Sequence, residues 1–371
     1  MRRQSRDCQP QVNFPNSGTA STFPSRSCYT ASMMSLNPFG PLRPVRLRAA
    51  GRYLPLWLAL LGTLVSGSAF GAETDQFLTW DIELADASGA FNDYLDQEIA
   101  VFLDRANRRT RPYGDATALT LAFYTHLFQG LHASRVRHWL KHDEGVARYP
   151  DNSFSDLAYQ QQSIFQKPAF PFVLPMAQTI RVGDVYFGID KIGHMLGFGR
   201  RYLQIYERHR NAGLDDAAAL EKVIAWGIHH EAGLVGKLVD GIFSHADLEA
   251  NYQGFRMARA FCAGETPLFH NVEGVWVYRG GLDIRDYITP DFDESYNLND
   301  YARWRYRRVA PVFLALYGDN PLAPRVQKRF ARYRALGEPS LSKRLIDAHF
   351  DGRVPDPLYV HLFEKERNAK R

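Results

Sequence analysis

The chain contains little cysteine: three residues in 371, of which only Cys262 lies beyond residue 71. Cys8 and Cys28 fall in an N-terminal segment that we expect to be removed on export. No intrachain disulfide can then form, so an ordinary hydrophobic core must stabilise the remainder. Whether Cys262 pairs between chains is left open by the sequence.

The chain also lacks the short motifs that identify common catalytic sites. Neither HExxH, which marks zinc proteases, nor GxSxG, which marks serine hydrolases, occurs in it. After residue 71, no uncharged segment reaches the roughly 20 apolar residues that a spanning helix needs. No repeat with a period of about 20 to 50 residues is present, which excludes a solenoid. Any site must therefore be sought in the placement of single polar side chains.

Positive charge is distributed unevenly along the sequence. Residues 1–71 contain eight arginines, no lysine and one acid, Asp7. Removing them from the 45 basic and 40 acidic residues of the chain leaves 37 and 39, a net charge of −2 with neutral histidines. The basic character thus belongs to the N-terminal segment. The remainder gives no electrostatic reason to expect nucleic acid as a partner.

The N-terminal segment has the three parts of a secretory signal peptide. Arginines in residues 36–52 precede an apolar run over 54–65, and small residues follow over 66–72. We expect cleavage after Gly71 or Ala69, translation from an internal methionine, and a periplasmic mature protein. An uncleaved anchor is the alternative, but the run is shorter than a spanning helix. No cysteine lies at the predicted cleavage site, so we do not expect a lipoprotein.

Helical periodicity dominates the mature chain. Apolar residues recur at three- and four-residue spacing over 91–103 and 117–132, and again over 301–317, 323–336 and 340–350. The pattern predicts an all-α fold, mainly a helical bundle, in a single soluble domain over residues 72–371 that follows the extension and signal peptide of residues 1–71.

Two segments depart from this periodicity. Alternating apolar residues around glycine pairs predict one small β-hairpin within residues 268–287. Four prolines lie in residues 145–187, which predicts an irregular connection with a short helix near 155–164. The edge of a cleft for glycan or lipid is the alternative, although aromatic residues at helical spacing are more often ordinary core. His138 and His142 would share a helix face; we interpret that face as a wet surface, with a metal site as the alternative.

The candidate site lies in residues 188–262, where polar side chains interrupt three predicted helices. In the first helix, Asp190 and His194 are four residues apart and so share a face, either as two ligands or as an acid orienting an imidazole. Asp190 could instead interact with the helix dipole, and His194 could be an ordinary core histidine. Three glycines at positions 193, 197 and 199 predict that another backbone packs closely against this helix.

The second helix, predicted from Asp215, carries Glu231 within an apolar stripe that continues to Leu234 and Leu238. A carboxylate buried without a partner costs several kcal/mol. We therefore expect Glu231 to meet a partner or to take up a proton. The candidate partners are His194, Lys191, Lys237 and a metal ion.

The third helix follows a turn at Asp240 and begins at a predicted N-cap, Ser244. Asp247 lies three residues later, the spacing of a capping box, so a structural role competes evenly with a functional one. Asn251 lies within the apolar stripe of the same helix, and a buried amide needs several hydrogen bonds. Asp247 is one turn earlier on the same face and is the expected partner.

The residues Asp190-Lys191-x-x-His194, a helical Glu231, Asp240 in a turn and the segment 247–254, DLEANYQG, form an ordered pattern over about 65 residues. This pattern resembles that of VanZ-like membrane proteins and YfiM-like periplasmic proteins of bacteria. The resemblance implies a helical bundle of the cell envelope in which the DKxxH and DxxxN elements face each other. The chain departs from the VanZ-like pattern in having no hydrophobic spans, and the resemblance implies no particular reaction.

Two functions remain open. The first is a non-catalytic or ligand-binding envelope protein, in which Lys191 pairs with Glu231 and Asp247 with Asn251, and in which Lys191, Asp240, Asp247 and Asn251 are the binding candidates. The second is a hydrolase or transferase acting on an envelope lipid or glycan, with His194, Asp190 and Glu231 as catalytic candidates. A divalent metal would then be held by Asp190, His194, Glu231 and Asp247. The expected partner in both cases is a component of the cell envelope.

Overall fold

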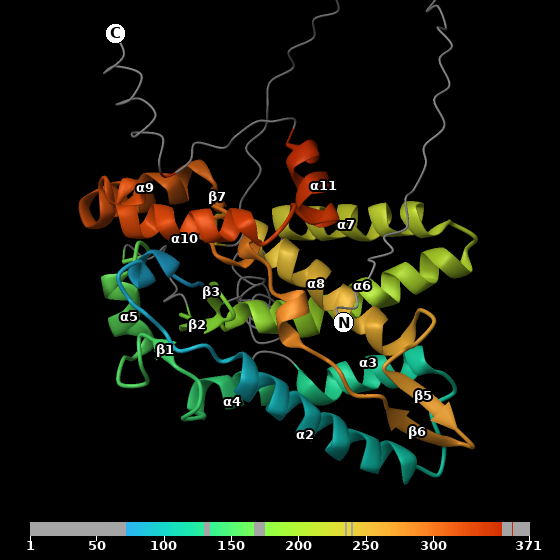
Figure 1. The fold of residues 1–371 in the computed structure, drawn as a ribbon. Coiled ribbons are helices and arrows are strands. Elements are labelled where there is room, and N and C mark those ends of the chain that lie inside the picture. The colour runs from blue at the N-terminus through green and yellow to red at the C-terminus, as the bar shows by residue number, and fades with distance from the viewer. Residues whose placement is uncertain are drawn as a thin grey trace, which may run out of the picture. The chain divides into compact units, whose positions relative to one another are not determined.

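The computed structural model describes residues 72–129, 134–166, 175–233, 236–238, 240–350 and 358, all within one compact unit that spans Ala59–Arg371. The predicted signal peptide lies outside the described residues. The described part is mainly helical, as predicted (Figure 1). Its ten α-helices are α2 (Ser88–Asn107), α3 (Ala116–Leu127), α4 (Arg135–His142), α5 (Asp156–Gln162), α6 (Asp190–Asn211), α7 (Asp216–Ala232), α8 (His245–Cys262), α9 (Arg303–Tyr317), α10 (Pro324–Ala335) and α11 (Leu341–His349).

Three small antiparallel sheets accompany the helices. The predicted hairpin is confirmed as β5 (Phe269–Val272) and β6 (Val275–Tyr278). Its two-residue turn has positive φ at both Glu273 and Gly274, as a turn that matches strand twist requires. The prediction of a single hairpin is wrong, because two further sheets form, with the orders β1-β2-β3 and β4-β7. Their strands are β1 (Arg148–Tyr149), β2 (Thr179–Val182), β3 (Val185–Gly188), β4 (Ile242–Phe243) and β7 (Asp300–Tyr301).

Within its described residues, 145–166 and 175–187, the segment with four prolines is more regular than its sequence suggests. It contains β1, the predicted short helix as α5, and the β2–β3 hairpin. Every residue of β3 is buried, as are all but one of β2. Strands buried on both faces show no polar alternation, so periodicity does not reveal them. This hairpin leads directly into α6 and so sets the position of the Asp190 end of that helix.

Helices α6 and α8 pack at backbone contact and form the frame of the candidate site (Figure 1). A Cβ on Gly199 would lie 2.6 Å from the carbonyl carbon of Gly254, and a Cβ on Gly254 would lie 2.0 Å from the oxygen of Met195. The predicted close approach is therefore confirmed at Gly199. At Gly193 and Gly197 the space is filled instead by the ring of Phe128.

Helix α7 is shorter than its apolar stripe predicts. It begins after the N-cap Asp215 as expected, but it ends at Ala232, before Gly233. Leu238 is 71% exposed, so it does not belong to the buried stripe. Leu234 lies outside the described residues. No helix of the described ranges is both long enough and apolar enough to cross a membrane.

Candidate functional site

The centre of the candidate site is the ammonium group of Lys191, in the first turn of α6. The side chain is 1% exposed, and its Nζ lies 2.6 Å from Asp190 Oδ2, 2.7 Å from Asp247 Oδ1 and 2.5 Å from Glu294 Oε1. Burial alone would lower the pKa of Lys191, but the three carboxylates outweigh it and hold that pKa well above its usual range. Lys191 is therefore a buried cation enclosed by three acids.

The three acids come from different parts of the chain. Asp190 precedes Lys191 on α6, Asp247 lies in the first turn of α8, and Glu294 follows the 3₁₀ turn at Pro290–Phe292. The second oxygen of Asp190 accepts a hydrogen bond of 2.7 Å from Thr74 Oγ1. Through Asp190 and Glu294, the lysine thus links the segment at Thr74 and the turn after Phe292 to the central helices.

Asp247 lies in the first turn of α8, but its carboxylate does not complete the predicted capping box, because the backbone N–H of Ser244 donates to Glu231 Oε1 instead. Its backbone N–H donates to Ser244 Oγ at 3.1 Å, which confirms Ser244 as the N-cap of α8. Its carboxylate lies between Lys191 Nζ and the Nε2 of His194, which is 3.3 Å from Oδ2. Burial would raise the pKa of Asp247, but the charges of His194 and Lys191 outweigh it and lower that pKa.

The contacts that position His194 come from residues of α8 and not from Asp190 on its own helix. Its Nδ1 lies 3.2 Å from Asn251 Oδ1, and its Nε2 faces Asp247. Asp190, which shares the helix face, is instead bonded to Thr74 and Lys191, so the prediction that Asp190 orients the imidazole is wrong. The DKxxH and DxxxN elements do face each other, through these two contacts of His194.

The polar network reaches the surface at one edge. The side chains of His194 and Asp247 are 10% and 14% exposed, whereas those of Lys191 and Asp190 are 1% and 2% exposed. The ring of His194 stacks on Phe198, one turn further along α6, with centroids 5.3 Å apart. A small ligand could therefore touch the histidine and its acid, but not the lysine beneath them.

Glu231, near the end of α7, is 5% exposed and does not pair with Lys191 as expected. Its Oε1 accepts a hydrogen bond of 3.0 Å from the backbone N–H of Ser244, and Gly236 packs close to the same oxygen. Burial first, and then the nearby charge of Asp247, raise the pKa of Glu231 well above its usual range. Of the outcomes predicted for this residue, proton uptake is the one that its surroundings favour.

Asp240 lies in the turn between α7 and α8, where its Oδ1 accepts from the backbone N–H of Ile242 at 2.8 Å. Burial raises its pKa from 3.8 to about 7. Its carbonyl oxygen accepts a hydrogen bond of 2.6 Å from Nε of Arg305, a residue that is 1% exposed. Asp240 therefore lies beside a second buried cation and not against Lys191.

Sequence reasoning missed several members of this region, above all Glu294. Its Oε1 contacts Lys191 Nζ and Ser244 Oγ, and its backbone N–H donates to Gln76 Oε1. Burial raises its pKa from 4.5 to about 7, against the opposing effect of Lys191. Glu294 lies in a turn without periodicity, so no apolar stripe marks it as buried. Glu73, which burial and neighbouring acids also push to a raised pKa, was missed for the same reason.

The predicted metal ligands are only partly brought together. Asp190, Asp247 and Glu294 each offer an oxygen, and these three oxygens lie within 4.8 Å of one another. His194 and Glu231, which the sequence proposed, do not belong to this group. Moreover, Lys191 Nζ is within 2.7 Å of all three acids, so a cation bound to them would have to displace the ammonium group. The donor set therefore fits a lysine better than a divalent ion.

Comparison of the chain with profiles of protein families, with curated protein sequences and with solved structures finds no match to any of them.

Proposed function

We propose that this chain is a non-catalytic protein of the bacterial cell envelope, and that its Asp/His/Glu/Asn constellation is a buried ionic network that fixes the packing of α6 on α8. The observation that carries the proposal is the enclosure of Lys191 by three carboxylates from separate segments. A buried charge that lacks one of its partners strongly destabilises a fold, so such a network selects one arrangement of the helices.

The state of His194 supports a structural role. A general base needs one ring nitrogen free to take a proton from a substrate. Here Nδ1 lies 3.2 Å from Asn251 Oδ1 and Nε2 lies 3.3 Å from Asp247 Oδ2, so both ring nitrogens already face an oxygen of the protein. Lys191, with three acids at hydrogen-bonding distance, is equally unavailable as a nucleophile, because its amine holds its proton.

The envelope location rests on the N-terminal sequence and on the resemblance to VanZ-like and YfiM-like proteins. Cell fractionation tests it: the protein is expected in the periplasmic extract, with Ala72 or Phe70 as its first residue by N-terminal sequencing. A cytosolic protein that retains residues 54–65 would contradict the location and leave the network proposal standing.

The network itself is tested by measuring metal content and unfolding of the His194→Ala and Glu231→Gln proteins. The proposal expects a metal-free protein in which His194→Ala lowers stability, whereas Glu231→Gln, which resembles the protonated acid and keeps the acceptor for Ser244 N–H, changes it little. Arg208 is exposed in the last turn of α6, the helix that carries His194. Arg208→Ala is therefore a control that should change stability little. A stoichiometric metal that is lost on either substitution would refute the proposal.

A hydrolase or transferase acting on an envelope lipid or glycan is the second candidate, and the partial exposure of the His194–Asp247 pair favours it. In that case His194 would exchange its proton with a substrate at Nε2, while Asn251 holds Nδ1. The deciding assay compares turnover of envelope lipid and glycan extracts by the purified protein and by Asn251→Asp. An activity abolished by His194→Ala in a still folded protein would establish this candidate.

A further inference from the structure

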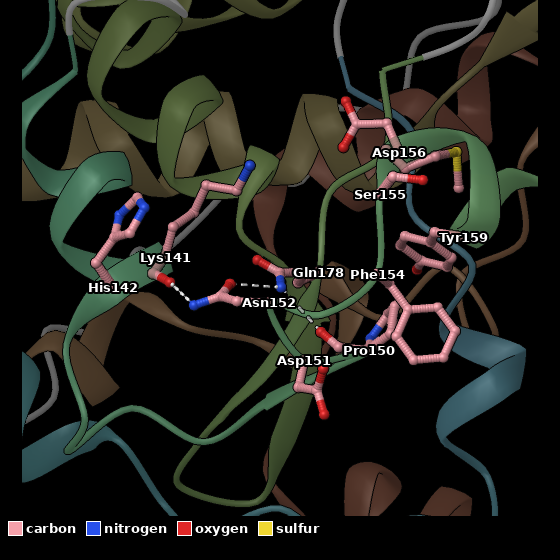
Figure 2. Close-up of a pocket in the computed structure, with 11 residues that line it drawn as sticks. Lys141, His142, Pro150, Asp151, Asn152, Phe154, Ser155, Asp156, Tyr159 and Gln178 are labelled. Carbon is pink, nitrogen blue, oxygen red and sulfur yellow. Dashed lines mark hydrogen bonds between the residues drawn. The ribbon is translucent and has the colours of Figure 1, made fainter.

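A separate pocket lies between the end of α4, the loop before α5 and the residues that lead into β2 (Figure 2). Its volume is about 220 Å³. At roughly 30 Å³ per water molecule, this is room for about seven waters, the scale of one small molecule. None of the residues of the polar network described above lines it.

The floor of the pocket includes an amide whose orientation is fixed and whose oxygen is unsatisfied. Gln178 is 6% exposed, and its Nε2 donates to Pro150 O at 2.9 Å and to Asn152 Oδ1 at 3.0 Å (Figure 2). Both bonds require the nitrogen where it is, so the amide cannot be flipped. The Oε1 is then buried with no hydrogen-bond partner among the described residues. Such an acceptor lacks a donor, which a bound ligand can provide.

The pocket walls carry unpaired charges of both signs. Lys141, on α4, and Asp156, at the start of α5, both line it, and within the described ranges neither forms an ion pair. Asp151 also lines the pocket, but its Oδ1 accepts from the backbone N–H of Ser153 at 2.8 Å. An apolar wall is supplied by Phe154, which is 36% exposed. A cation, two acids, an unsatisfied acceptor and an aromatic ring thus surround one small space, and Asp156 is the acid without a hydrogen-bonded backbone partner in the part of the chain that the structure describes.

We propose that this pocket binds a small zwitterion with the chemistry of a free α-amino acid. The ligand carboxylate pairs with Lys141, the ammonium group is drawn to Asp156 and provides the donor that Gln178 Oε1 lacks, and an apolar side chain packs on Phe154. A neutral sugar would satisfy the amide but would leave both charges unused. The proposal goes beyond the function given above and does not depend on the network around Lys191.

Binding is tested on the full-length protein by calorimetry with the common L-amino acids, one at a time. For any that binds, the N-acetylated and the carboxamide forms follow, each of which removes one ligand charge. Each blocked form is expected to bind about tenfold more weakly, because a charge-assisted contact is lost. Asp156→Asn should remove the discrimination against the N-acetylated form, and Lys141→Gln should remove the discrimination against the carboxamide.

Glu221→Gln and Lys222→Gln make the same charge changes at exposed positions of α7 and serve as controls that should bind as the wild type does. Three results would overturn the proposal. One is the absence of binding by every amino acid at up to about 10 mM, where a site of millimolar affinity is filled. Another is undiminished binding of the N-acetylated form, and the third is binding of glucose or N-acetylglucosamine in preference to any amino acid.

Discussion

Replacing Lys191 with methionine removes the charge at the centre of the network and nearly preserves the volume of the side chain. Three carboxylates that lie 2.5 to 2.7 Å from Nζ then lose their shared cation at a point that is 1% exposed. Breaking a buried ion pair from one side costs about 3 to 5 kcal/mol. We expect a loss of this size in the free energy of unfolding at pH 8, where all three acids must either stay charged or take up protons.

The loss should shrink as the pH falls. Glu294 already has a pKa raised from 4.5 to about 7, and Lys191 is one of the groups that oppose this rise. An acid with a raised folded-state pKa stabilises the fold below its unfolded pKa, and this contribution is lost as the pH rises through the folded value. Removing Lys191 raises that folded value further. At pH 5 Glu294 is protonated in both proteins, so the difference between them should be smaller than at pH 8.

Urea unfolding followed by circular dichroism at pH 8 and pH 5 provides the measurement. Lys237→Met is the matched control, because Lys237 also contacts an acid, Asp300, at 2.5 Å, but its side chain is 34% exposed. Exposed pairs contribute about 1 kcal/mol or less. If Lys191→Met were no more destabilising than Lys237→Met at pH 8, or equally destabilising at both pH values, the account of the network would be refuted.

Three further predictions concern packing, capping and acid stability. Gly254→Ala should lower the free energy of unfolding in urea by about 1 to 3 kcal/mol, because its Cβ would lie 2.0 Å from a carbonyl oxygen of α6. Gly89→Ala, whose Cβ would have nothing within 4 Å, should be neutral or stabilising. Equal effects of the two substitutions would contradict the close packing. Ser244→Ala should lower the melting temperature by more than Ser155→Ala, because Ser244 caps α8 and also donates to Glu294; rescue by threonine checks the hydroxyl. Burial lowers the pKa of His245 from 6.5 to about 4, so its neutral form favours folding above pH 6.5 and this contribution is lost as the pH falls towards 4; a His245→Phe protein with an unchanged stability profile over that range would disprove it.

The larger helices could be predicted because their apolar residues repeat over several turns. The short strands could not, since β4 and β7 have two residues each and no period can be read from two residues. The end of α7 was missed for a different reason. Leu238 continues the 3.6-residue spacing past Gly233, and the spacing outweighed the local stop signal that a glycine provides.

The sequence could predict which helical residues belong to the candidate site, but not which of them contact each other. Glu231 and Asn251 stood out because each lies within an apolar stripe. One partner of Lys191, Glu294, comes from a turn that folds back over a sequence separation of 103 residues, and no helical period reports such a contact. The assignment of Glu231 to Lys191 was wrong because Asp190, Asp247 and Glu294 surround the ammonium group, and helical periodicity does not report which residues of different helices meet.

The long reach of the Lys191 network has a consequence for biosynthesis. Its contacts span 116 residues back to Thr74, through Asp190, and 103 residues forward to Glu294. Until the chain has been made past Glu294, the lysine has at most two of its acids, and burying it is correspondingly less favourable. The helices can form during synthesis, but the ammonium group of Lys191 is more stable hydrated until Glu294 is available to pair with it. The core around Lys191 can therefore fold completely only when the chain is nearly complete. A product truncated before Glu294 would leave this region unfolded and sensitive to proteases.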